Sequence, residues 1–539
     1  MIIGIAQVNP IVGAIEHNKD LILNSIKTAK TELNVDTLIF PELVLTGYPP
    51  EDLLYRSQLF TQVTNAIETI VSESKNINII LGYPRKEKDN IYNSCAYISN
   101  EELIRSYDKM ILPNYGVFDE VRYFSAGSHP CLVDIGNIKT CLTVCEDIWS
   151  ATPAKLAKDQ GAELIININA SPFHKEKFEE RRNVLKTRNN ETGLPIIYVN
   201  LTGGQDELIF DGSSLAIDSD GLIQTIAPSF TEGLFTVNLE QDNNKISFST
   251  SNNNIPELTD NEAIYKALVT AIGDYVRKNG FNGVIIGLSG GIDSALVTCL
   301  AVDALGAENV EVVMMPSKYT ADMSVEDSLA LANNLGINYQ NISIEKPVSA
   351  FMELLDPIFN NLPADSTEEN IQARSRGLIL MAISNKSRRL VLATGNKSEM
   401  AVGYATLYGD MAGGFSPLKD IPKLLVYELA NFINQSGNII PQRIIDRPPS
   451  AELRADQKDE DSLPPYEILD PILEMYIEQD KSPQQIINIG FDKNDVMPVI
   501  NLVDRSEFKR RQAPPGVKIS KRSFGKERRY PITSGYRET

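Results

Sequence analysis

The segment GLSGGIDS, residues 287–294, has the composition of a phosphate-binding turn. It follows an apolar run and leads into a helical pattern, so its glycines let the backbone approach a ligand while N–H groups point at an anion. The lysine of a P-loop, GxxxxGK[ST], is missing. Asp293 lies in the turn instead, and a carboxylate beside a polyphosphate needs a cation between them, so we expect Mg²⁺ at Asp293. For these residues alone, a glycine turn with a capping Asp and Ser is the alternative interpretation.

Cys145 is the second residue with reactive chemistry. It ends the alternating run KTCLTVC and precedes Glu146 and Asp147. A single cysteine at a strand end is usually a small buried apolar residue. As a nucleophile it needs a base, which could be a histidine, as in papain-like sites, or a carboxylate with a lysine as electrostatic partner. Glu42, after the apolar run TLIF, and Lys109, in YDKMILP, are candidates for the second arrangement, although Glu42 alone is typical of a helix start.

The five cysteines are too few and too unpatterned for a disulfide framework, so we expect free thiols. Cys141 and Cys145 could suggest a metal pair. A closed zinc site requires four ligands, however, and the sequence has only three histidines. We therefore do not assign these cysteines to a metal.

Two different patterns of elements position these residues. The first half alternates short apolar runs that end in Gly, Pro, Asn or Asp with stretches of helical spacing, which predicts sheet layers covered by helices. In the second half, strands alternate regularly with crossover helices, which predicts a doubly wound parallel sheet. Ligands of such sheets lie beyond the carboxyl ends of the strands, where SGGIDS and TGNKSE both occur. The predicted strands are residues 2–8, 37–43, 77–84, 140–146, 163–171 and 195–201 in the first half, and 283–289, 310–316, 338–344 and 389–396 in the second.

Between the halves, residues 241–261 are rich in Asn, Ser and Asp, and we place a linker there. The prediction is a first domain at 1–245, a linker at 246–260 and a second domain at 261–539. The tail from Arg505 to Thr539 is basic and contains aromatic residues, so we expect it to fold over an anionic substrate.

Composition and charge restrict the function. The chain has 539 residues, enough for two domains, and a net charge of −20 argues against nucleic-acid binding, since phosphate contacts require an excess of Lys and Arg. No apolar run is long enough for a bilayer, and the start lacks the pattern of a secretory signal. We therefore expect a cytoplasmic protein that acts on small molecules, without membrane or nucleic-acid partners.

The second half resembles known enzymes. SGGIDSA, residues 289–295, is similar to the signature of the ATP pyrophosphatases, while 369–377 and 394–423 resemble NAD synthetases. In that family, a carboxylate of deamido-NAD attacks ATP to form an acyl-adenylate that ammonia opens, a reaction that depends on positioning and charge neutralisation. The resemblance implies that ATP, a co-substrate, is held by Gly287, Leu288, Ser289, Gly290, Gly291, Ile292, Asp293, Ser294 and Thr394, that Asp293 and Glu399 bind Mg²⁺, and that deamido-NAD contacts Asn370, Glu399 and Lys509; Lys419 and Lys423 are further candidates for phosphate contact.

The first half resembles the nitrilase (carbon–nitrogen hydrolase) superfamily. FPE, YDKMILP and TVCED are similar to its Glu-Lys-Cys triad, which implies an α-β-β-α sandwich. By this resemblance Cys145 attacks an amide, Glu42 is the general base and Lys109 stabilises the oxyanion. Glu120 corresponds to an auxiliary carboxylate. The resemblance also implies that Tyr115, Ser171 and Lys177 bind the substrate, and a cation at 177 favours glutamine because it suits an α-carboxylate.

Together the halves resemble the glutamine-dependent NAD⁺ synthetase family: one site releases ammonia and the other consumes it. The resemblance implies an α/β chain with a nitrilase-type sandwich before a Rossmann-like ATP pyrophosphatase domain, a protected ammonia path, and a homo-oligomer that is at least a dimer through the synthetase domains. Two alternatives stay open at this point. One is a glutamine-fed adenylating synthetase with another acceptor, and the other is a nucleotide-sensing module that regulates an amidase.

Overall fold

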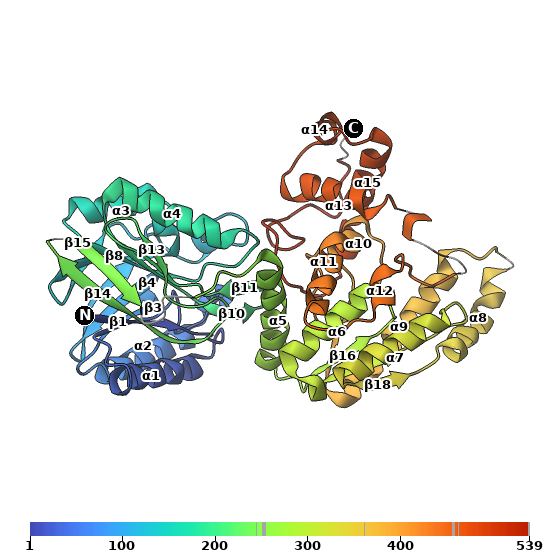
Figure 1. Cartoon of the computed structure of the whole chain (residues 1–539), viewed down its shortest axis with the longest axis horizontal. Coiled ribbons are helices and arrows are strands. Elements are labelled where there is room, and N and C mark those ends of the chain that lie inside the picture. Colours follow the sequence, from blue (N-terminus) through green and yellow to red (C-terminus); the bar gives the residue numbers. More distant parts are fainter. Residues whose placement is uncertain are drawn as a thin grey trace. The chain divides into compact units, whose positions relative to one another are not determined.

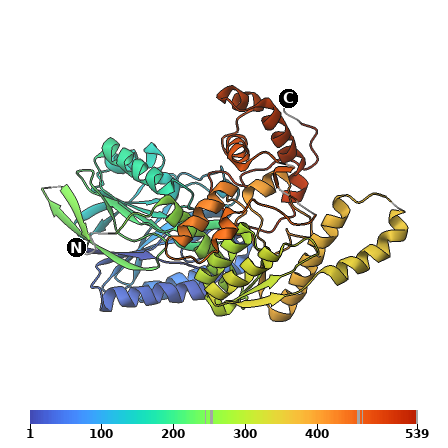
Figure 2. The same ribbon diagram turned by 45° about the vertical axis from the view of Figure 1, so that its right-hand side comes forward.

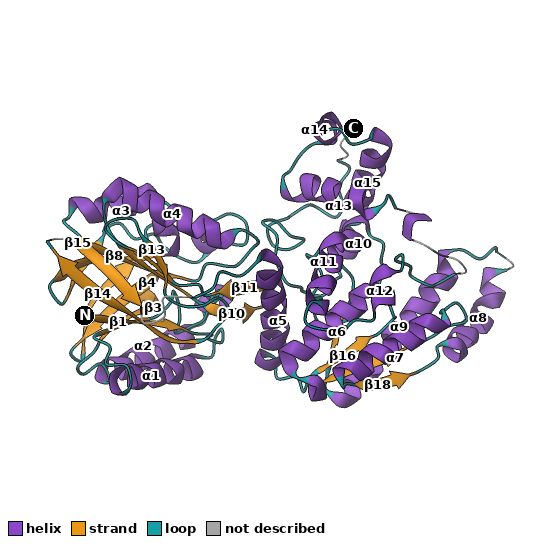
Figure 3. Cartoon of the chain, viewed as in Figure 1, coloured by secondary structure: helices purple, strands orange, loops and turns teal. Residues whose placement is uncertain are grey.

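The computed structural model describes residues 1–243, 245–250, 255–360, 362–454, 457, 459–461 and 463–536. The chain divides into two compact units, Met1–Asp260 and Asn261–Thr539. Each unit is an α/β structure, and helices are more abundant in the second (Figure 3). Among the described residues, no helix is both long and apolar enough to cross a membrane.

Two sheets form the centre of the first unit. Helices α1 (Ile15–Thr31) and α2 (Ser57–Ser72) cover one sheet, and α3 (Ala151–Asp159) and α4 (Lys177–Thr192) cover the other (Figure 1). This is the expected α-β-β-α sandwich. The first sheet has the order β15 (Lys245–Thr250), β14 (Gly233–Asp242), β1 (Ile2–Gln7), β2 (Thr37–Ile39), β3 (Asn78–Glu87), β4 (Asn90–Ser99), β5 (Glu102–Asp108), and the second β13 (Ile223–Thr225), β12 (Leu215–Ile217), β9 (Ile196–Asn200), β8 (Leu164–Asn169), β7 (Ile138–Val144), β6 (Cys131–Ile135); β10 (Thr202–Gln205) and β11 (Leu208–Asp211) form a separate ribbon.

Apolar side chains hold the four layers together. Between the sheets, Ile5 and Ile80 pack with Val144 and Ile168 in one buried cluster. Strand β8 is buried along its whole length, as the continuous run LIININ predicts for a strand covered on both faces. This core holds the two sheets together, and Glu42, Lys109 and Cys145 lie after the carboxyl ends of β2, β5 and β7.

The predicted linker is partly wrong. Residues Lys245–Thr250 form strand β15, which pairs antiparallel with β14. Ile246 and Phe248 are buried and alternate with exposed residues, so one face of this polar segment joins the core. The high content of Asn and Ser concealed that period of two. Residues 255–259 form neither helix nor strand, and the predicted linker positions 251–254 lie outside the described residues.

The second unit contains a parallel sheet with the order β18-β17-β16-β19, and helices that pack against its strands. The strand order changes direction at β16, so the turns after β16 and β19 lie at the switch point, where a ligand is expected. Helix α8 and the start of α9 extend side by side away from the sheet (Figure 2). The strands are β16 (Val284–Gly287), β17 (Val310–Met314), β18 (Asn338–Asn341) and β19 (Leu390–Leu392); the helices are α5 (Asp260–Lys278), α6 (Ile292–Leu305), α7 (Asp322–Leu335), α8 (Glu345–Phe359), α9 (Ser366–Ser387), α10 (Lys397–Val402), α11 (Lys423–Asn434), α12 (Gln442–Asp446), α13 (Tyr466–Leu473), α14 (Pro483–Ile489), α15 (Lys493–Arg505) and α16 (Glu507–Arg510).

Candidate active sites

Glu42 and Lys109 form a buried ion pair in the first unit. Glu42 lies in the loop after β2, Lys109 directly follows β5, and both side chains are fully buried. Lys109 Nζ is 2.8 Å from Glu42 Oε1 and 2.9 Å from Glu120 Oε1. The second oxygen of Glu42 accepts a hydrogen bond from the Ala170 backbone at 2.8 Å, which ties this carboxylate to the end of β8 in the other sheet. The structure thus brings together three charged residues that the sequence analysis assigned to one site.

The local backbone holds Glu42 in place. A Cβ atom added to Gly82 of β3 would lie 2.2 Å from Leu43 N and 2.7 Å from the Glu42 carbonyl carbon. Asn93 of β4 donates a 2.7 Å hydrogen bond to Glu42 Oε1. The close backbone approach at Gly82 and the Asn93 amide therefore fix the candidate base from two neighbouring strands.

Cys145 begins a 3₁₀ turn (Cys145–Ile148) at the carboxyl end of β7. Its φ of 43° lies in the left-handed region, which is strained for a cysteine and frequent at functional positions. The thiol is buried, and burial followed by the charge of Glu42 raises its pKa well above the usual value, whereas Lys109 lowers it. A raised pKa favours the protonated thiol, so a base is needed to remove its proton before the sulfur attacks.

The Glu42 and Glu120 carboxylates are buried against the same Lys109 ammonium group. Burial raises the pKa of Glu120 to about 7, and Lys109 opposes that shift. Burial alone would lower the pKa of Lys109, but Glu120 and Glu42 raise it well above its usual value. Lys109 is therefore a fixed cation close to the thiol, as the stabilisation of an oxyanion requires.

The Asp147 carboxylate positions the nucleophile turn, a role that sequence reasoning missed. It accepts hydrogen bonds from the Val144, Met110 and Ile111 backbone N–H groups at 2.9–3.1 Å and from the Tyr107 hydroxyl at 2.7 Å. One buried side chain thus joins the turn that carries Cys145 to the segment that carries Lys109. The sequence shows TVCED as a motif, but not this long-range pairing.

The three predicted glutamine-binding residues differ in exposure and in contacts. Tyr115 is 58% exposed, and its hydroxyl donates to the Glu146 carboxylate at 2.9 Å. Ser171 is buried after β8. Lys177 begins α4 with its ammonium 3.9 Å from the centre of the Trp149 ring. Cys145 influences the pKa values of Tyr115 and Lys177, so both residues lie within electrostatic range of the sulfur.

Ser171 is supported by an ion pair that the sequence did not reveal. Arg181 donates a 2.8 Å hydrogen bond to the Ser171 carbonyl and is 2.7 Å from Asp211. Asn200 Oδ1 accepts a 2.9 Å hydrogen bond from the Ser171 backbone. These partners come from α4, β11 and β9, which are distant in the sequence. Their contacts fix the backbone on which the Ser171 hydroxyl is presented.

The second unit has a cavity of about 260 Å³ at the carboxyl ends of β16 and β19. Its lining includes the turn residues Gly287, Leu288, Ser289, Gly291, Ile292, Asp293 and Ser294, together with Thr394 and Glu399. Gly290 is not among the described lining residues. Its φ is 79°, and a Cβ atom there would lie 2.6 Å from the Ser324 carbonyl oxygen, so only glycine allows this close approach to α7.

Asp293, Glu399 and Lys423 meet in this cavity. Lys423 forms an ion pair with Asp293, and its Nζ is 3.7 Å from Glu399 Oε1. Burial followed by the charge of Asp293 raises the pKa of Glu399 to about 8, while Lys423 lowers it. Asn396 caps α10, accepting from the Glu399 backbone and donating to Asp293 at 3.0 Å. The Asp293 and Glu399 carboxylates therefore line the same cavity, and their mutual repulsion favours the binding of a cation there.

Asn370 and Lys509 contact residues 403–406, which lie beside the cavity. Neither is among the described residues that line the cavity. Asn370 accepts a 2.8 Å hydrogen bond from Thr406, and Lys509 donates to the Gly403 and Ala405 carbonyl oxygens at 2.8 Å. Both thus hold residues 403–406, which reach the cavity through Tyr404 and Ala405. Lys419 instead donates to the Pro514 carbonyl.

The cavity also contains charged residues that the sequence prediction omitted. Arg376 and Asp410 line it; burial lowers the pKa of Arg376 to about 10 and raises that of Asp410 to about 6. In the basic tail, Arg510 and Arg528 both pair with Glu507, at 2.9 and 3.0 Å. That the tail covers a substrate stays a prediction.

Comparison with known proteins agrees with this geometry. The carbon–nitrogen hydrolase family matches residues 2–244, and the NAD synthase family matches residues 264–513. A glutamine-dependent NAD(+) synthetase from Acinetobacter baylyi is 47% identical over 541 residues, covering 99% of this chain and 98% of the relative. The enzyme of that name from Thermotoga maritima is 42% identical, covering 99% and 98%.

Two solved structures have the same architecture. The glutamine-dependent NAD+ synthetase from Acinetobacter baumannii, in complex with ADP, superposes with a TM-score of 0.80 at 43% identity and covers 100% of this chain and 99% of its own. The enzyme of that name from Cytophaga hutchinsonii has a TM-score of 0.86 at 22% identity, covers 99% and 98%, and supports the fold alone.

Proposed function

The chain belongs to the glutamine-dependent NAD(+) synthetases, and we propose that the residues of its two sites divide one reaction between them. The carbon–nitrogen hydrolase unit hydrolyses glutamine to glutamate and ammonia. The NAD synthase unit adenylates deamido-NAD with ATP, releasing pyrophosphate, and amidates the adenylate to give NAD⁺ and AMP. The observation that carries the residue assignment is the burial of Glu42 and Lys109 in one ion pair within electrostatic range of the strained Cys145.

In the glutaminase reaction, Glu42 accepts the proton of the Cys145 thiol as sulfur attacks the amide carbon. Lys109 stabilises the negative charge on the amide oxygen. The proton is returned to the leaving nitrogen, ammonia departs, and water hydrolyses the thioester to glutamate and the free thiol. Glu120 keeps Lys109 oriented, since it binds the same ammonium.

The glutamine α-groups are assigned to Tyr115, Ser171 and Lys177. Lys177 lies within electrostatic range of the sulfur and carries a positive charge suited to an α-carboxylate, while Ser171 and Tyr115 offer hydroxyl groups. Burial lowers the pKa of Lys177, and Glu180, 3.6 Å away, supports its charge. This arrangement favours glutamine over a simple amide that lacks the α-carboxylate.

In the synthetase reaction, the turn after β16 and Thr394 bind the ATP phosphates. The start of α6 lines the cavity, where a helix N-terminus favours an anion, and Lys423 adds positive charge. Two facing carboxylates fit Mg²⁺, which usually takes one or two carboxylates together with substrate phosphates. Asp293 and Glu399 would hold the ion, where it would neutralise phosphate charge. Among the described residues, no group of three or more His, Cys, Asp or Glu side chains could hold a metal ion. Binding of Mg²⁺ at these two carboxylates would therefore need phosphate oxygens of the substrate as further ligands.

Deamido-NAD is assigned to the region between this cavity and residues 403–406. Glu399 lines the cavity side of this region. Asn370 and Lys509 form hydrogen bonds with residues of the 403–406 segment. Substrate contact by Asn370 and Lys509 then requires that their side chains exchange present partners for groups of the dinucleotide.

We also propose a homo-oligomer, at least a dimer through the synthetase unit, in the cytoplasm. In α8, all of whose residues are described, none is buried. Leu354 and Ile358 are each 72% exposed, and Phe351 on the same face is 42% exposed. Such a contiguous apolar face is typical of an interface. The cytoplasmic assignment is supported by the five cysteines, all of which are free.

The test is to incubate the protein with glutamine, ATP, Mg²⁺ and deamido-NAD and to quantify every product. Glutamate, pyrophosphate, AMP and NAD⁺ should all form, and omission of deamido-NAD should abolish pyrophosphate. Pyrophosphate release with another acid but not with deamido-NAD would support a different acceptor. Glutamate formation without any pyrophosphate would support a nucleotide sensor instead.

A further inference from the structure

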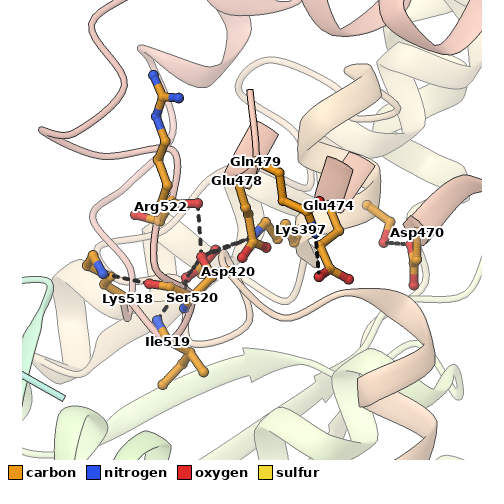
Figure 4. Close-up of polar contacts among 12 residues, drawn as sticks. Lys397, Asp420, Asp470, Glu474, Glu478, Gln479, Lys518, Ile519, Ser520 and Arg522 are labelled. Carbon is orange, nitrogen blue, oxygen red and sulfur yellow. Dashed lines mark hydrogen bonds and ion pairs between the residues drawn. The ribbon is translucent and has the colours of Figure 1, made fainter. Parts of the chain in front are cut away.

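A buried polar network lies next to the carboxylates of the synthetase site. The Lys397 ammonium, in a residue 2% exposed, contacts Asp420 Oδ1 at 2.8 Å, Glu478 Oε1 at 2.6 Å and Ser520 Oγ at 3.1 Å (Figure 4). Asp420 is also 2% exposed. The four residues come from α10, the loop before α11, the π-helical turn Glu474–Glu478 and the C-terminal tail. The network thus joins four segments that the chain order separates.

Asp420 anchors the tail through its main chain. Its Oδ2 accepts hydrogen bonds from two consecutive backbone N–H groups, those of Ile519 at 2.8 Å and Ser520 at 2.7 Å. Lys518 Nζ donates a 2.6 Å hydrogen bond to the Ser520 carbonyl oxygen, which links two residues within the tail. By contrast, the Arg522 side chain points away from Asp420 (Figure 4). It pairs with Asp480, whose side chain is 62% exposed.

Each of the three residues before Glu399 bonds a carboxylate from a different part of the second unit. Asn396 bonds Asp293, Lys397 bonds Asp420, and Ser398 bonds Asp470. Ser398 Oγ also accepts a 3.0 Å hydrogen bond from the Lys423 backbone. Asp420 lies three residues before Lys423, so the network supports both Glu399 and Lys423 at their main chains.

We propose that Lys397 and Asp420 are positioning residues that make the C-terminal tail part of the framework of the Asp293–Glu399–Lys423 site. Tail residues Ile519 and Ser520 hold Asp420, Asp420 and Glu478 hold Lys397, and Lys397 fixes α10 two residues before Glu399. None of these network residues lines the cavity, as far as its lining is described. Their effect on the reaction is exerted through α10 and the start of α11. The inference rests on the proposed function for its catalytic consequence, but the mechanical link can be tested independently.

The experiment compares amide hydrogen exchange in the full chain and in three variants. In Asp420→Asn, peptides covering 516–523 and 395–402 should both exchange faster, because the amide cannot replace the carboxylate toward Lys397 and the tail together. Lys397→Met keeps the tail on Asp420 but releases α10, so only 395–402 should exchange faster. Asp480→Asn breaks the exposed pair of the same tail and should leave both peptides unchanged.

The functional readout is ammonium-driven NAD⁺ synthesis. For Lys397→Met, the KM for MgATP should rise on the order of tenfold to a hundredfold with glutamine hydrolysis unchanged, since a small displacement of the site weakens binding. A purely structural role would reduce the amount of folded enzyme without changing that KM. Wild-type exchange at 395–402 in Lys397→Met would overturn the proposal, even if Asp420→Asn fails to fold. If the wild-type chain makes no NAD⁺ from ammonium, the proposed function fails, and the exchange result still decides the link.

Discussion

At Glu120, burial and a neighbouring cation act on the carboxyl group in opposite directions. Burial raises its pKa to about 7 from 4.5, while Lys109 lowers it. Because the pKa is higher in the folded protein, the stability that this group contributes is fully present below pH 4.5 and is lost as the pH rises through 7. The rate of glutamine hydrolysis should instead increase with pH over this range, because only ionised Glu120 fully orients the Lys109 ammonium.

We therefore predict that glutamine hydrolysis increases as the pH rises through about 7. Glu120→Gln, which resembles the protonated form, should be slower by on the order of tenfold to a hundredfold and should lose this part of the profile. The measurement is the pH dependence of kcat for glutamine hydrolysis without the synthetase substrates. An unchanged acidic limb in the variant would remove Glu120 from the mechanism.

Asp293 gives a second prediction for a single residue. Asp293→Asn keeps the shape of the turn but removes a carboxylate from the cation site, so NAD⁺ synthesis should fall about a hundredfold or more with either nitrogen source. Glutamine hydrolysis should persist. Asp303→Asn, at the other end of α6, is the matched control because its side chain bonds Tyr265 instead. Synthesis retained in Asp293→Asn would contradict the proposed magnesium role.

The reactive residues are easier to identify from the sequence than the residues that position them. Glu42, Lys109 and Cys145 lie in the short motifs FPE, YDKMILP and TVCED, whose resemblance to a known triad allowed them to be assigned jointly. Asp147 could not, because its partners Met110 and Ile111 lie more than thirty residues away. Residues that position others depend on tertiary pairing, which local patterns do not encode.

At the scale of elements, the 3₁₀ turn Cys145–Ile148 depends on Asp147. Asp147→Ala leaves several buried N–H groups without a partner, and it should lower the free energy of unfolding of the first unit by about 3 kcal/mol. It should also abolish glutamine hydrolysis, because the turn and Lys109 lose their common anchor, while ammonium-driven synthesis persists. Thermal unfolding and both assays check this outcome. Asp134→Ala, an exposed acid on neighbouring β6, serves as the control, and equal effects of both variants would refute the anchoring role.

The elements themselves were predictable where apolar runs are continuous. Strand β8 and the first three residues of β16 are buried and lie in mainly apolar runs, so the sequence alone indicates these strands. Strand β15 was taken for linker because only Ile246 and Phe248 face the core and the rest is polar. The alternation of strands and helices predicted that the turns after β16 and β19 lie at the carboxyl edge of a parallel sheet, whereas the pairing of β16 with β19, which creates the switch point, is known only from the structure.

For the whole molecule, the exposed face of α8 predicts assembly. Replacing Leu354 and Ile358 by Glu should lower the mass measured by analytical ultracentrifugation, because the new charges would be buried in an apolar contact. The glutaminase rate should not change. Glu353→Gln, an exposed polar residue of the same helix, should retain the wild-type mass. An oligomer unaffected by the two charges would exclude α8 as the contact.

The central claim is that one chain separates nitrogen release from nitrogen use. Cys145→Ser, assayed once with glutamine and once with an ammonium salt at alkaline pH, tests it most directly. We predict that glutamine-driven NAD⁺ formation disappears while the ammonium-driven rate stays near wild type. Undiminished synthesis from glutamine, or loss of both reactions in a folded variant, would contradict the account.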